Sequence, residues 1–488
     1  CLLGGLLFGV SPEASASPEK LFEQSLNSRA DRFEIGPVDG AVPGAWWDTL
    51  NVPIVQSWVE EGLQNNHSLQ AAWERVEQAR QFSNQSGSVL LPSVQIQGGG
   101  YRNSTEGLLQ QLAWQSGGTV PDQVLDYLGE QYDTAQWSLS ANWLIDLFGS
   151  ATSARMASRW DARAAQGQRA AQSMATAHQI GATAFDWMAA KETEAVIRRQ
   201  ITAQEELLEA SRLRFARAEA SALDVLMQEQ QLSLTRAALP SVETQIARSE
   251  GRLATLLGRA ERDVSVTELS GIALPQPELP QGIGTPLDLL QNRPDLRMAV
   301  ANMEASKRRE WSAWLGLMPA LSLSASTGET GQKIGTDADW QTAGSWSFGV
   351  SASIPLFSGG RLFAAARGAR ATAQAAGYDF QGALLSAVRE VEDAWTFLEQ
   401  THREVEAYEA SAQASRDAGK LAREQYLAGV LPTINLLAAE QAQLQAELAL
   451  IQMRRARLTA HVGLHDAIGA PWAVHQARNE RVFSGEEP

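Results

Sequence analysis

The 488-residue sequence has no apolar run long enough to cross a membrane as a helix. A membrane-spanning helix needs about 20 consecutive apolar residues. The mean hydropathy of -0.22 is also ordinary for a water-soluble chain. If this chain enters a bilayer, we therefore expect it to do so as a β-barrel, because only helices and closed barrels satisfy their backbone hydrogen bonds in lipid.

Basic residues are also scarce, with 40 Lys and Arg against 56 Asp and Glu and a net charge of -16. A nucleic-acid-binding protein needs a basic surface to meet phosphates, so this balance argues against that class. The only cysteine is Cys1. A chain that begins at cysteine is typical of a processed bacterial lipoprotein with an acylated N-terminus. Alternatively, residues 2–16 are the remnant of a signal peptide; both interpretations indicate export.

Motifs for catalysis are missing as well. The sequence contains no phosphate-binding loop, no nucleophile elbow and no cysteine-based site. His461 and His465 have the spacing of a zinc-binding helix, but no third ligand accompanies them. We therefore expect a structural histidine pair, no metal, no cofactor and no enzymatic activity.

What the sequence does have is strict alternation of large apolar and small polar residues between Trp346 and Leu356. A period of two is typical of a strand whose two faces meet different solvents. The stretch from Trp137 has the same layout, since both begin Trp-Ser and continue to Leu-Phe. With two shorter alternating stretches, the predicted strands are about 93–102, 136–147, 320–328 and 345–357.

The matching strands belong to two copies of one unit. QNNHSL from Gln64 matches QNRPDL from Gln291, and FARAEASALDVL from Phe215 matches YLAGVLPTINLL from Tyr426. We place repeat 1 at 50–257 and repeat 2 at 286–468. A proline-containing linker at 258–285 joins them, an N-terminal segment at 1–49 precedes them and a tail at 469–488 follows.

Alanine-rich stretches almost free of Gly and Pro follow the second strand of each repeat. Their apolar residues recur every three or four positions, which predicts long helices at 150–217, 222–257, 360–427 and 433–468. A helix over 150–217 would span about 100 Å, more than the diameter of a compact domain. An ordinary antiparallel coiled coil remains the alternative at this point.

Four strands cannot close a membrane barrel, which starts at about eight strands, so several chains must pool their strands. We expect a lipid-facing and a lumen-facing set. The lipid-facing set is Trp137, Leu139, Trp143, Trp346, Phe348, Val350 and Ile354. The lumen-facing set is Ser138, Ser140, Asn142, Ser347, Ser351 and Ser353.

These motifs, with LLQNRPDLRMA from Leu289 and the strand exits IPLFSGGR and LIDLFGS, resemble the TolC family of outer-membrane efflux channels, in its lipoprotein (OprM/CusC-like, NodT) branch. The resemblance covers almost the whole chain. It implies an α+β homotrimer whose 12-stranded transmembrane β-barrel stands on a helical periplasmic tunnel with a mixed equatorial belt. It also implies a lipid anchor at Cys1 and docking to a periplasmic adaptor fed by an inner-membrane transporter, which we expect to be of the resistance-nodulation-division type.

In this family the helix tips gate the tunnel and contact the adaptor. By position, the corresponding residues are Arg217, Ala218, Glu219, Asp224, Gly429 and Asn435. Ala218 replaces the usual turn glycine, and Asn435 stands where an aspartate is common, which argues against a ring of gating carboxylates. Asp224 is either part of a polar latch or the N-cap of the following helix.

We expect a structural ion pair for Arg293 and Asp295, which flank Pro294 at a helix start. The predicted function is a passive exit duct for drugs or small solutes in a tripartite efflux pump. A type I protein-secretion duct and a metal-efflux duct share the architecture. A trimeric autotransporter-like adhesin anchor and a soluble coiled-coil scaffold are alternatives of another class.

Overall fold

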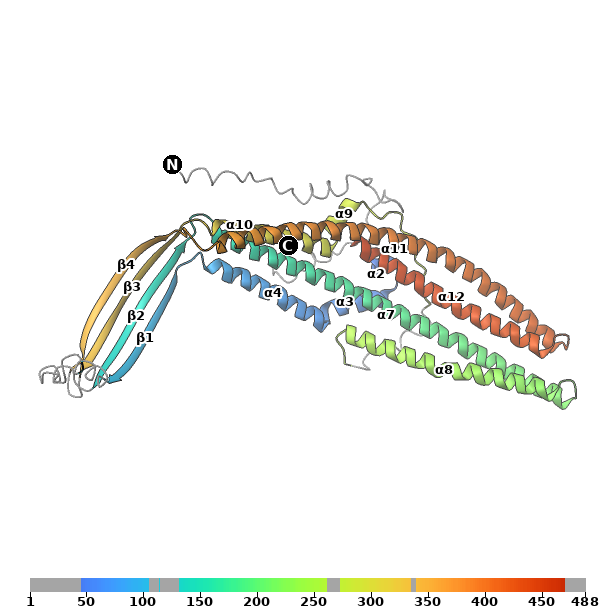
Figure 1. The fold of residues 1–488 in the computed structure, drawn as a ribbon. Coiled ribbons are helices and arrows are strands. Elements are labelled where there is room, and N and C mark those ends of the chain that lie inside the picture. The colour runs from blue at the N-terminus through green and yellow to red at the C-terminus, as the bar shows by residue number, and fades with distance from the viewer. Residues whose placement is uncertain (1–44, 105–113, 115–130, 261–272, 335–338, 470–488) are drawn as a thin grey trace. The chain divides into compact units, whose positions relative to one another are not determined.

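The computed structural model describes residues 45–104, 114, 131–260, 273–334 and 339–469 (Figure 1). The chain divides into two compact units. We call residues 77–163 and 301–377 the sheet unit, and the remaining described residues the hairpin unit. Cys1, most of the N-terminal segment and nearly all of the C-terminal tail lie outside the described residues, as do parts of the linker and of the loops between strands.

The sheet unit contains one antiparallel sheet with the order β1-β2-β3-β4 (Figure 1). Its strands are β1 (Ser93–Ser104), β2 (Gln131–Ile145), β3 (Ala320–Ile334) and β4 (Gln341–Ser353). The two hairpins come from the two halves of the sequence, and β2 pairs with β3 to join them. Parts of α4 (His67–Ser88), α7 (Ser150–Ala216), α10 (Pro294–Leu315) and α11 (Arg361–Leu427) complete this unit.

The strand register places large apolar side chains on one face of the sheet and small polar ones on the other. Trp143 pairs with Leu323, and Leu323 with Val350, so their large side chains share one face. Ser322 and Ser351 pair on the opposite face, where their hydroxyls lie 2.7 Å apart. We call these the apolar and the polar face. Because side chains alternate along every strand, one register places the whole apolar set together.

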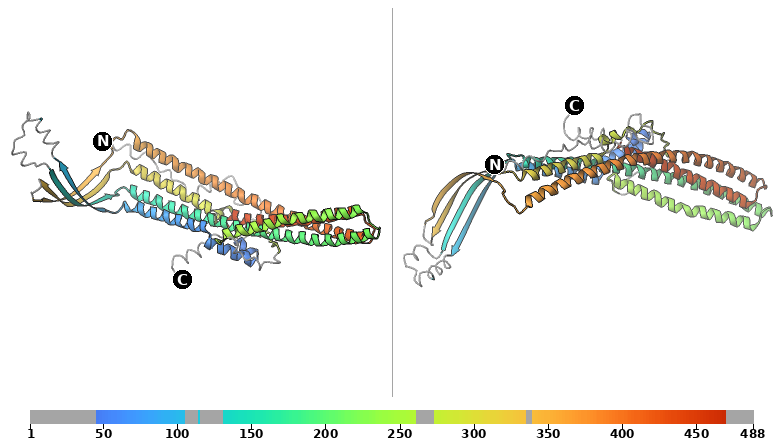
Figure 2. Two further views of the ribbon diagram at one scale, coloured as in Figure 1. Left: turned by 90° about the horizontal axis from the view of Figure 1, so that it is seen from below. Right: turned by 45° about the horizontal axis from the view of Figure 1, so that its top comes forward.

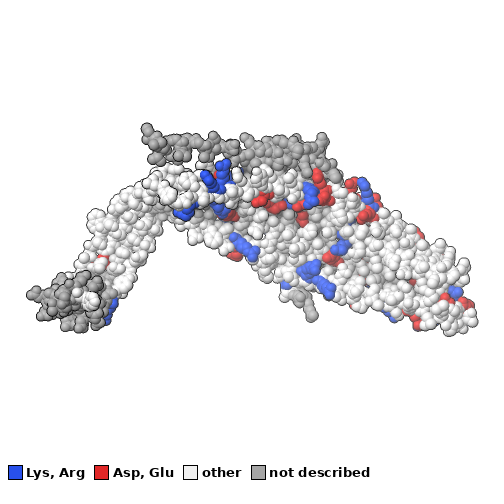
Figure 3. Space-filling model, in the orientation of Figure 1, with Lys and Arg blue, Asp and Glu red and all other residues white. Residues whose placement is uncertain are grey.

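The charged residues of the sheet lie in the half of the strands towards the loops, and the sheet is otherwise white in the space-filling view (Figure 3). They are Arg102, Asp133, Glu329 and Lys333. Arg102 pairs with Asp133 at 2.7 Å across neighbouring strands. The rest of the sheet is therefore a band of uncharged residues.

The predicted bounds of three strands need correction. β4 ends at Ser353, so Ile354 lies just beyond the strand in which we expected it. The turn that follows, with prolines and glycines at 355–360, cannot continue a paired strand. β2 begins at Gln131 and β3 ends at Ile334, so both extend further into the loops than the apolar alternation indicated.

The hairpin unit contains two long helical hairpins, which Figure 2 shows from two further sides. The first joins α7 to α8 (Ala222–Leu256), and the second joins α11 to α12 (Thr433–Ile468). Ion pairs tie the helices together: Arg198 of α7 to Glu243 of α8, and Arg454 of α12 to Glu409 of α11. These helices start and end within one residue of the predicted bounds.

Short helices pack against the hairpins away from their tips. They are α2 (Trp46–Thr49), α3 (Pro53–Asn65) and α9 (Pro286–Asn292). The largest apolar cluster unites α2, α3, α7, α8 and α12 around Trp46, Trp58 and Phe185. A Cβ on Gly181 would lie 2.4 Å from the Trp46 ring, so glycine is required for this close approach.

Within the described residues, no helix is both long enough and apolar enough to cross a membrane.

Candidate functional site: the hairpin tips

Each hairpin turns through the same backbone motif. In tip one, Glu219 N–H donates to Arg214 C=O at 2.8 Å, and in tip two Val430 N–H donates to Gln425 C=O at 2.9 Å. Both motifs need a residue with positive φ, which is Ala218 (φ 61°) in tip one and Gly429 (φ 78°) in tip two. A left-handed alanine costs about 1–2 kcal/mol, whereas glycine adopts this conformation freely.

The helices that leave the two turns are capped differently. Ser221 is the N-cap of α8, where its hydroxyl accepts from Asp224 N–H at 3.2 Å and the Asp224 carboxylate accepts from Ser221 N–H at 2.9 Å. Asp224 is therefore the third residue of a reciprocal capping box, not the N-cap that sequence reasoning offered. At tip two the N-cap of α12 is Pro432, which supplies no side-chain hydrogen bond.

Tyr426 joins the two tips. Its side chain is only 1% exposed, and its hydroxyl lies 2.7 Å from the Ser211 hydroxyl on α7. The Arg214 guanidinium donates to Tyr426 C=O at 2.9 Å and lies 5.0 Å from the ring centroid. The Tyr426 ring is thus packed, its hydroxyl is hydrogen-bonded and a guanidinium lies above it. These contacts hold the helical hairpin α7–α8 against the hairpin α11–α12 near their tips.

Asp224 adds a second link between the tips. A hydrogen bond from the Thr433 hydroxyl of α12, followed by those from Ser221, holds the pKa of Asp224 below its usual range. The positive charge of Arg214 acts in the same direction. We call Ser211, Arg214, Asp224, Tyr426 and Thr433 the tip latch. Its members come from both repeats and from all four long helices.

Above the latch, Glu440 of α12 is fully buried with Arg423 of α11 as its partner at 3.3 Å. Burial raises the pKa of Glu440, and the pairing with Arg423 only partly opposes that shift. One Glu440 carboxylate oxygen and the Arg423 Nε lack hydrogen-bond partners among the described residues. Buried, incompletely paired charges are costly, so this pair is a weak point of the packed tip.

Not all predicted tip residues join the latch. Asp224 does, and Ala218 and Gly429 form the turns, but Arg217, Glu219 and Asn435 are exposed and take no part in it. Sequence reasoning missed Ser211, Arg214, Tyr426 and Thr433. A signal existed for two of them, because Ser211 and Tyr426 occupy positions on the buried faces of their helices where apolar residues are usual.

Large apolar side chains are exposed around both turns. They are Leu213, Phe215, Leu223, Leu226, Leu427, Val430 and Ile434. We call this set the tip patch. Exposed apolar residues gathered in one place, with a few charges beside them (Figure 3), are typical of a protein interaction surface.

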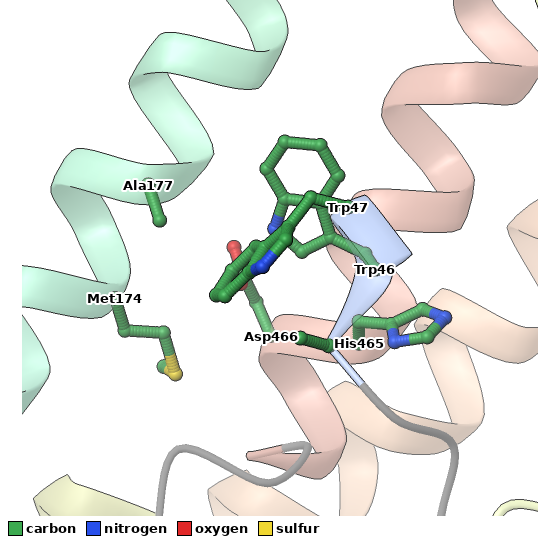
Figure 4. A pocket seen from close by; sticks show the side chains of 7 residues that line it. Trp46, Trp47, Met174, Ala177, His465 and Asp466 are labelled. Carbon is green, nitrogen blue, oxygen red and sulfur yellow. The ribbon is translucent and has the colours of Figure 1, made fainter. Parts of the chain in front are cut away.

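A small, mostly apolar cavity of about 10 Å³ lies where α2 packs on α12 and α7 (Figure 4). Trp46, Trp47, Met174, His465 and Asp466 line it, together with Ala45 and Ala177. A void of this size holds at most one water molecule. It is therefore a packing feature and not a ligand pocket.

The neighbouring histidines are structural. The Thr49 hydroxyl donates to Trp46 C=O at 2.8 Å, so its oxygen is left to accept from His461 Nε2 at 3.3 Å. Burial, followed by the nearby His465 and Arg457, lowers the pKa of His461 to about 3. His461 is thus a neutral member of the core. Among the described residues, no group of three or more His, Cys, Asp or Glu side chains is placed to hold a metal ion.

Two sets of partly exposed ion pairs hold the same region. His178 of α7 contacts Asp466 of α12, and this contact raises the pKa of His178 despite its burial. Arg293 pairs with Asp295 and with Glu390, each at 2.7 Å, and donates to Ala467 C=O. The structural role expected for Arg293 and Asp295 thus agrees with the contacts observed. Neither pair points to chemistry.

Comparison with known proteins gives one consistent answer. The family model described as outer membrane efflux protein matches residues 58–259 and 285–470. The pyoverdine export outer membrane protein OpmQ of Pseudomonas aeruginosa is 27% identical over 427 residues, which is 88% of this chain and 87% of that protein. Nodulation protein T of Rhizobium leguminosarum bv. trifolii is 25% identical over 473 residues, or 96% and 95% of the two chains.

The fold is similar to solved structures. The outer-membrane channel OprN superposes with a TM-score of 0.76 and 25% sequence identity, covering 91% of this chain and 97% of that one. The open state of the Neisseria gonorrhoeae MtrE outer membrane channel superposes with a TM-score of 0.73 at 22% identity, covering 90% and 95%. The second comparison supports the fold alone.

Proposed function

The chain belongs to the outer membrane efflux protein family and is an exit duct of the outer membrane; from this premise we propose how it is assembled and what it conducts. Three copies form a 12-stranded barrel that continues into a helical tunnel across the periplasm. The family is one of channels, so energy for transport comes from the partners.

The two-faced sheet is the observation that carries this proposal. Its outer strands, β1 and β4, each pair on one side only, and open edges are not tolerated in lipid. Joining β4 of one copy to β1 of the next removes every edge. Trp137, Leu139, Trp143, Trp346, Phe348 and Val350 would then face lipid. Ser138, Ser140, Asn142, Ser347, Ser351 and Ser353 would line the lumen.

The tip latch is the gate of the duct in this proposal, and the tip patch docks the periplasmic adaptor. The latch suits a gate because it joins the two hairpins through few contacts at their very ends. The patch suits docking because its apolar side chains are exposed on both turns. The adaptor would connect the duct to an inner-membrane transporter of the resistance-nodulation-division type.

The names of the relatives are the basis for the substrate class that we propose. One relative is named for pyoverdine export, and others for toluene efflux or antibiotic efflux. We infer that this duct conducts small organic solutes, drugs included. Protein secretion and metal efflux remain the alternatives within the same architecture.

Oligomer mass and transport test the proposal together. Protein solubilised from outer membranes should have about three times the 52.8 kDa chain mass by light scattering. A strain that lacks the duct should regain drug efflux with the wild-type chain. A Val430→Asp, Ile434→Asp variant should stay trimeric but fail to restore efflux, because charges in the tip patch oppose apolar docking.

A matched control is Leu356→Asp, Phe357→Asp, which introduces the same two charges at exposed apolar residues beyond β4. It should keep efflux if the tip patch is specific. A detergent-free monomer in the soluble fraction would contradict the duct itself. Normal efflux by the tip variant would contradict only the assignment of the docking surface.

A further inference from the structure

All charged residues of the described strands lie on the apolar face of the sheet. They are Arg102 of β1, Asp133 of β2, and Glu329 and Lys333 of β3. The polar face of the same strands carries Ser, Thr, Asn, Gln, Gly and a few larger uncharged residues, but no charged one. In the proposed barrel the polar face lines a water-filled lumen, whereas the apolar face meets lipid. These charges therefore occupy the face on which charge is least expected.

The strand register arranges the apolar face in rows that run across the sheet. Ile96 pairs with Leu139, which is joined through Thr327 to Trp346, so these residues lie in one row. From this row to the helical end of the strands, every row contains large apolar side chains and no charged one. We call these rows the apolar band. Trp137 lies one row nearer to the loops.

Arg102, Asp133 and Lys333 form a row of their own on the loop side of the apolar band. In the strand register, Asp133 pairs with Arg102 on one side and with Lys333 on the other. The Arg102 guanidinium donates to both carboxylate oxygens of Asp133, at 2.7 and 2.8 Å, yet its side chain stays 72% exposed. Lys333 is half-buried. We call these three residues the cationic row, because two cations flank one anion.

In the proposed barrel, the cationic row lies at the height of the lipid headgroups. Successive rows on one face are two residues apart, about 6.6 Å along a strand, and membrane strands tilt by about 40°. Along the membrane normal, the row is therefore about 10 Å further out than Trp137 and about 15 Å further out than the apolar band. Tryptophan side chains collect at the boundary between hydrocarbon and headgroups. Beyond that boundary, a charge on the outer face costs little.

The charges of the cationic row match those of a phosphate. Asp133 orients Arg102 through Nε and Nη2, so the N–H groups of Nη1 and the Lys333 ammonium take no part in that contact. Such groups form strong, charge-assisted hydrogen bonds to phosphate oxygens. Glu329 lies four residues from Lys333, about 13 Å along the strand. Its repulsion of an anion is therefore largely screened at physiological ionic strength, where the Debye length is about 8 Å.

We propose that Arg102 and Lys333 hold a phosphate group of a phosphorylated glycolipid in the outer leaflet, while the acyl chains of that lipid lie along the apolar band. An outer membrane presents such a glycolipid on the side away from the periplasm, which is the loop side of the sheet in the proposed duct. The site rests on that proposed function, because it needs the apolar face to meet lipid. It gives the outer end of the barrel a lipid-specific contact.

Lipid binding to the solubilised protein tests the site. The probe is diphosphoryl lipid A, added to protein extracted from outer membranes in a neutral detergent, and native mass spectrometry measures the lipid bound. Arg102→Gln, Lys333→Gln should bind this probe at least tenfold more weakly, because two charge-assisted contacts are lost. Phosphatidylcholine, which carries no net charge, should bind the variant and the wild type equally.

The matched control is Arg367→Gln, Arg370→Gln. It removes two exposed arginines of α11 from the same unit, at positions outside the sheet, and should bind the probe like the wild type. Both variants should remain trimeric, since all four side chains lie outside the buried core. Inorganic phosphate at matched ionic strength should not displace the probe, because it has no acyl chains to contact the apolar band.

Salt dependence provides a second readout that needs no substitution. Raising the salt concentration from about 0.1 M to about 0.5 M should weaken binding of diphosphoryl lipid A to the wild type several-fold, since screening weakens contacts between exposed charges. Binding of phosphatidylcholine should not change. Salt-independent binding of diphosphoryl lipid A would overturn the role of the cationic row even if the double variant failed to fold.

Failure of this site and failure of the duct are distinguishable. If light scattering finds a trimer but Arg102→Gln, Lys333→Gln binds diphosphoryl lipid A as tightly as its control, the cationic row is only solvated and the inference is wrong. Displacement of the probe by inorganic phosphate would show an anion site and overturn the lipid assignment. Recovery of a detergent-free soluble monomer would mean that the proposed duct fails first.

Discussion

The two hairpin tips share one backbone motif but hold it in different ways. Tip one has a strained Ala218 turn, which the Ser221–Asp224 capping box and the hydrogen bond from Thr433 offset. Tip two has an unstrained Gly429 turn, no side-chain cap, and the buried Tyr426 anchor. Tip one therefore relies on polar contacts at its surface, whereas tip two relies on buried packing.

This difference bears on the proposed gate. The polar contacts of tip one reach across to tip two, and the Tyr426 hydroxyl of tip two reaches back to Ser211. Each tip is thus stabilised by the other repeat. Small contacts of this kind can be broken without unfolding the long helices, because local opening needs far less free energy than global unfolding.

The largest loss of tip stability should follow from removing the Tyr426 side chain, the buried anchor of tip two. Tyr426→Ala removes a fully packed aromatic ring and should lower the free energy of local opening by about 3–5 kcal/mol. Hydrogen exchange of the amides near both turns would measure it. Tyr408→Ala, a partly exposed tyrosine on the same helix, is the control and should change little. Equal protection in the two variants would contradict the anchor.

The next effect concerns the cap of tip one. Asp224→Ala removes the capping box and the link to Thr433, and should cost about 1–2 kcal/mol of local stability. Asn435→Ala changes the equivalent residue of tip two, which is exposed and caps nothing, and should cost less than about 0.5 kcal/mol. If both substitutions cost the same, the two tips do not differ in the way described.

Exchanging the turn residues should change the stability of the two tips in opposite directions. Ala218→Gly should stabilise tip one by up to about 1 kcal/mol, because it relieves a left-handed alanine. Gly429→Ala should destabilise tip two by about 1–2 kcal/mol for the same reason. Amide exchange at the two turns would report both signs. A loss of protection in the Ala218→Gly variant would show that its backbone is not strained.

The smallest effects should appear on acidification, and they too have opposite signs. The pKa of Asp224 lies below 3.8, so its contribution is present above that pH and is lost as the pH falls through the lowered pKa. The pKa of Glu440 lies above 4.5, so the stability of its protonated form is present below that pH and is lost as the pH rises through the raised pKa.

Between neutral pH and about pH 4, tip two should therefore become more stable while tip one stays unchanged. Protection factors corrected for intrinsic exchange rates would show this. Glu440→Gln should abolish the dependence at tip two. A pH response that persists in this variant would mean that another group is responsible.

Sequence reasoning reached the family and the exit-duct function, and the comparisons confirm both. It located the long helices and the two faces of the sheet because helical spacing and strict alternation are local patterns. It left Asp224 either in a polar latch or as the N-cap of α8 and did not consider Ser221, since both residue types suit a cap and only geometry separates them.

Most residues of the tip latch could not be predicted from the sequence. Ser211 and Tyr426 are 215 positions apart, and nothing local announces that their hydroxyls meet. Arg214 was overlooked in favour of Arg217, three residues along, because which arginine reaches the other hairpin depends on the rotation of α7. Tertiary packing decides which residue of one repeat contacts which residue of the other. In a single sequence the only trace of such a contact is a polar residue at a helix position where an apolar one is expected.

Single-channel recording in planar lipid bilayers tests the central claim most directly. We expect the wild-type protein to form discrete channels of low conductance, and the Tyr426→Ala, Asp224→Ala variant to form channels of the same kind with clearly higher conductance. The matched Tyr408→Ala, Asn435→Ala variant should behave like the wild type. An absence of channels in every case, or equal conductance with and without the tip latch, would contradict a duct that closes at its tips.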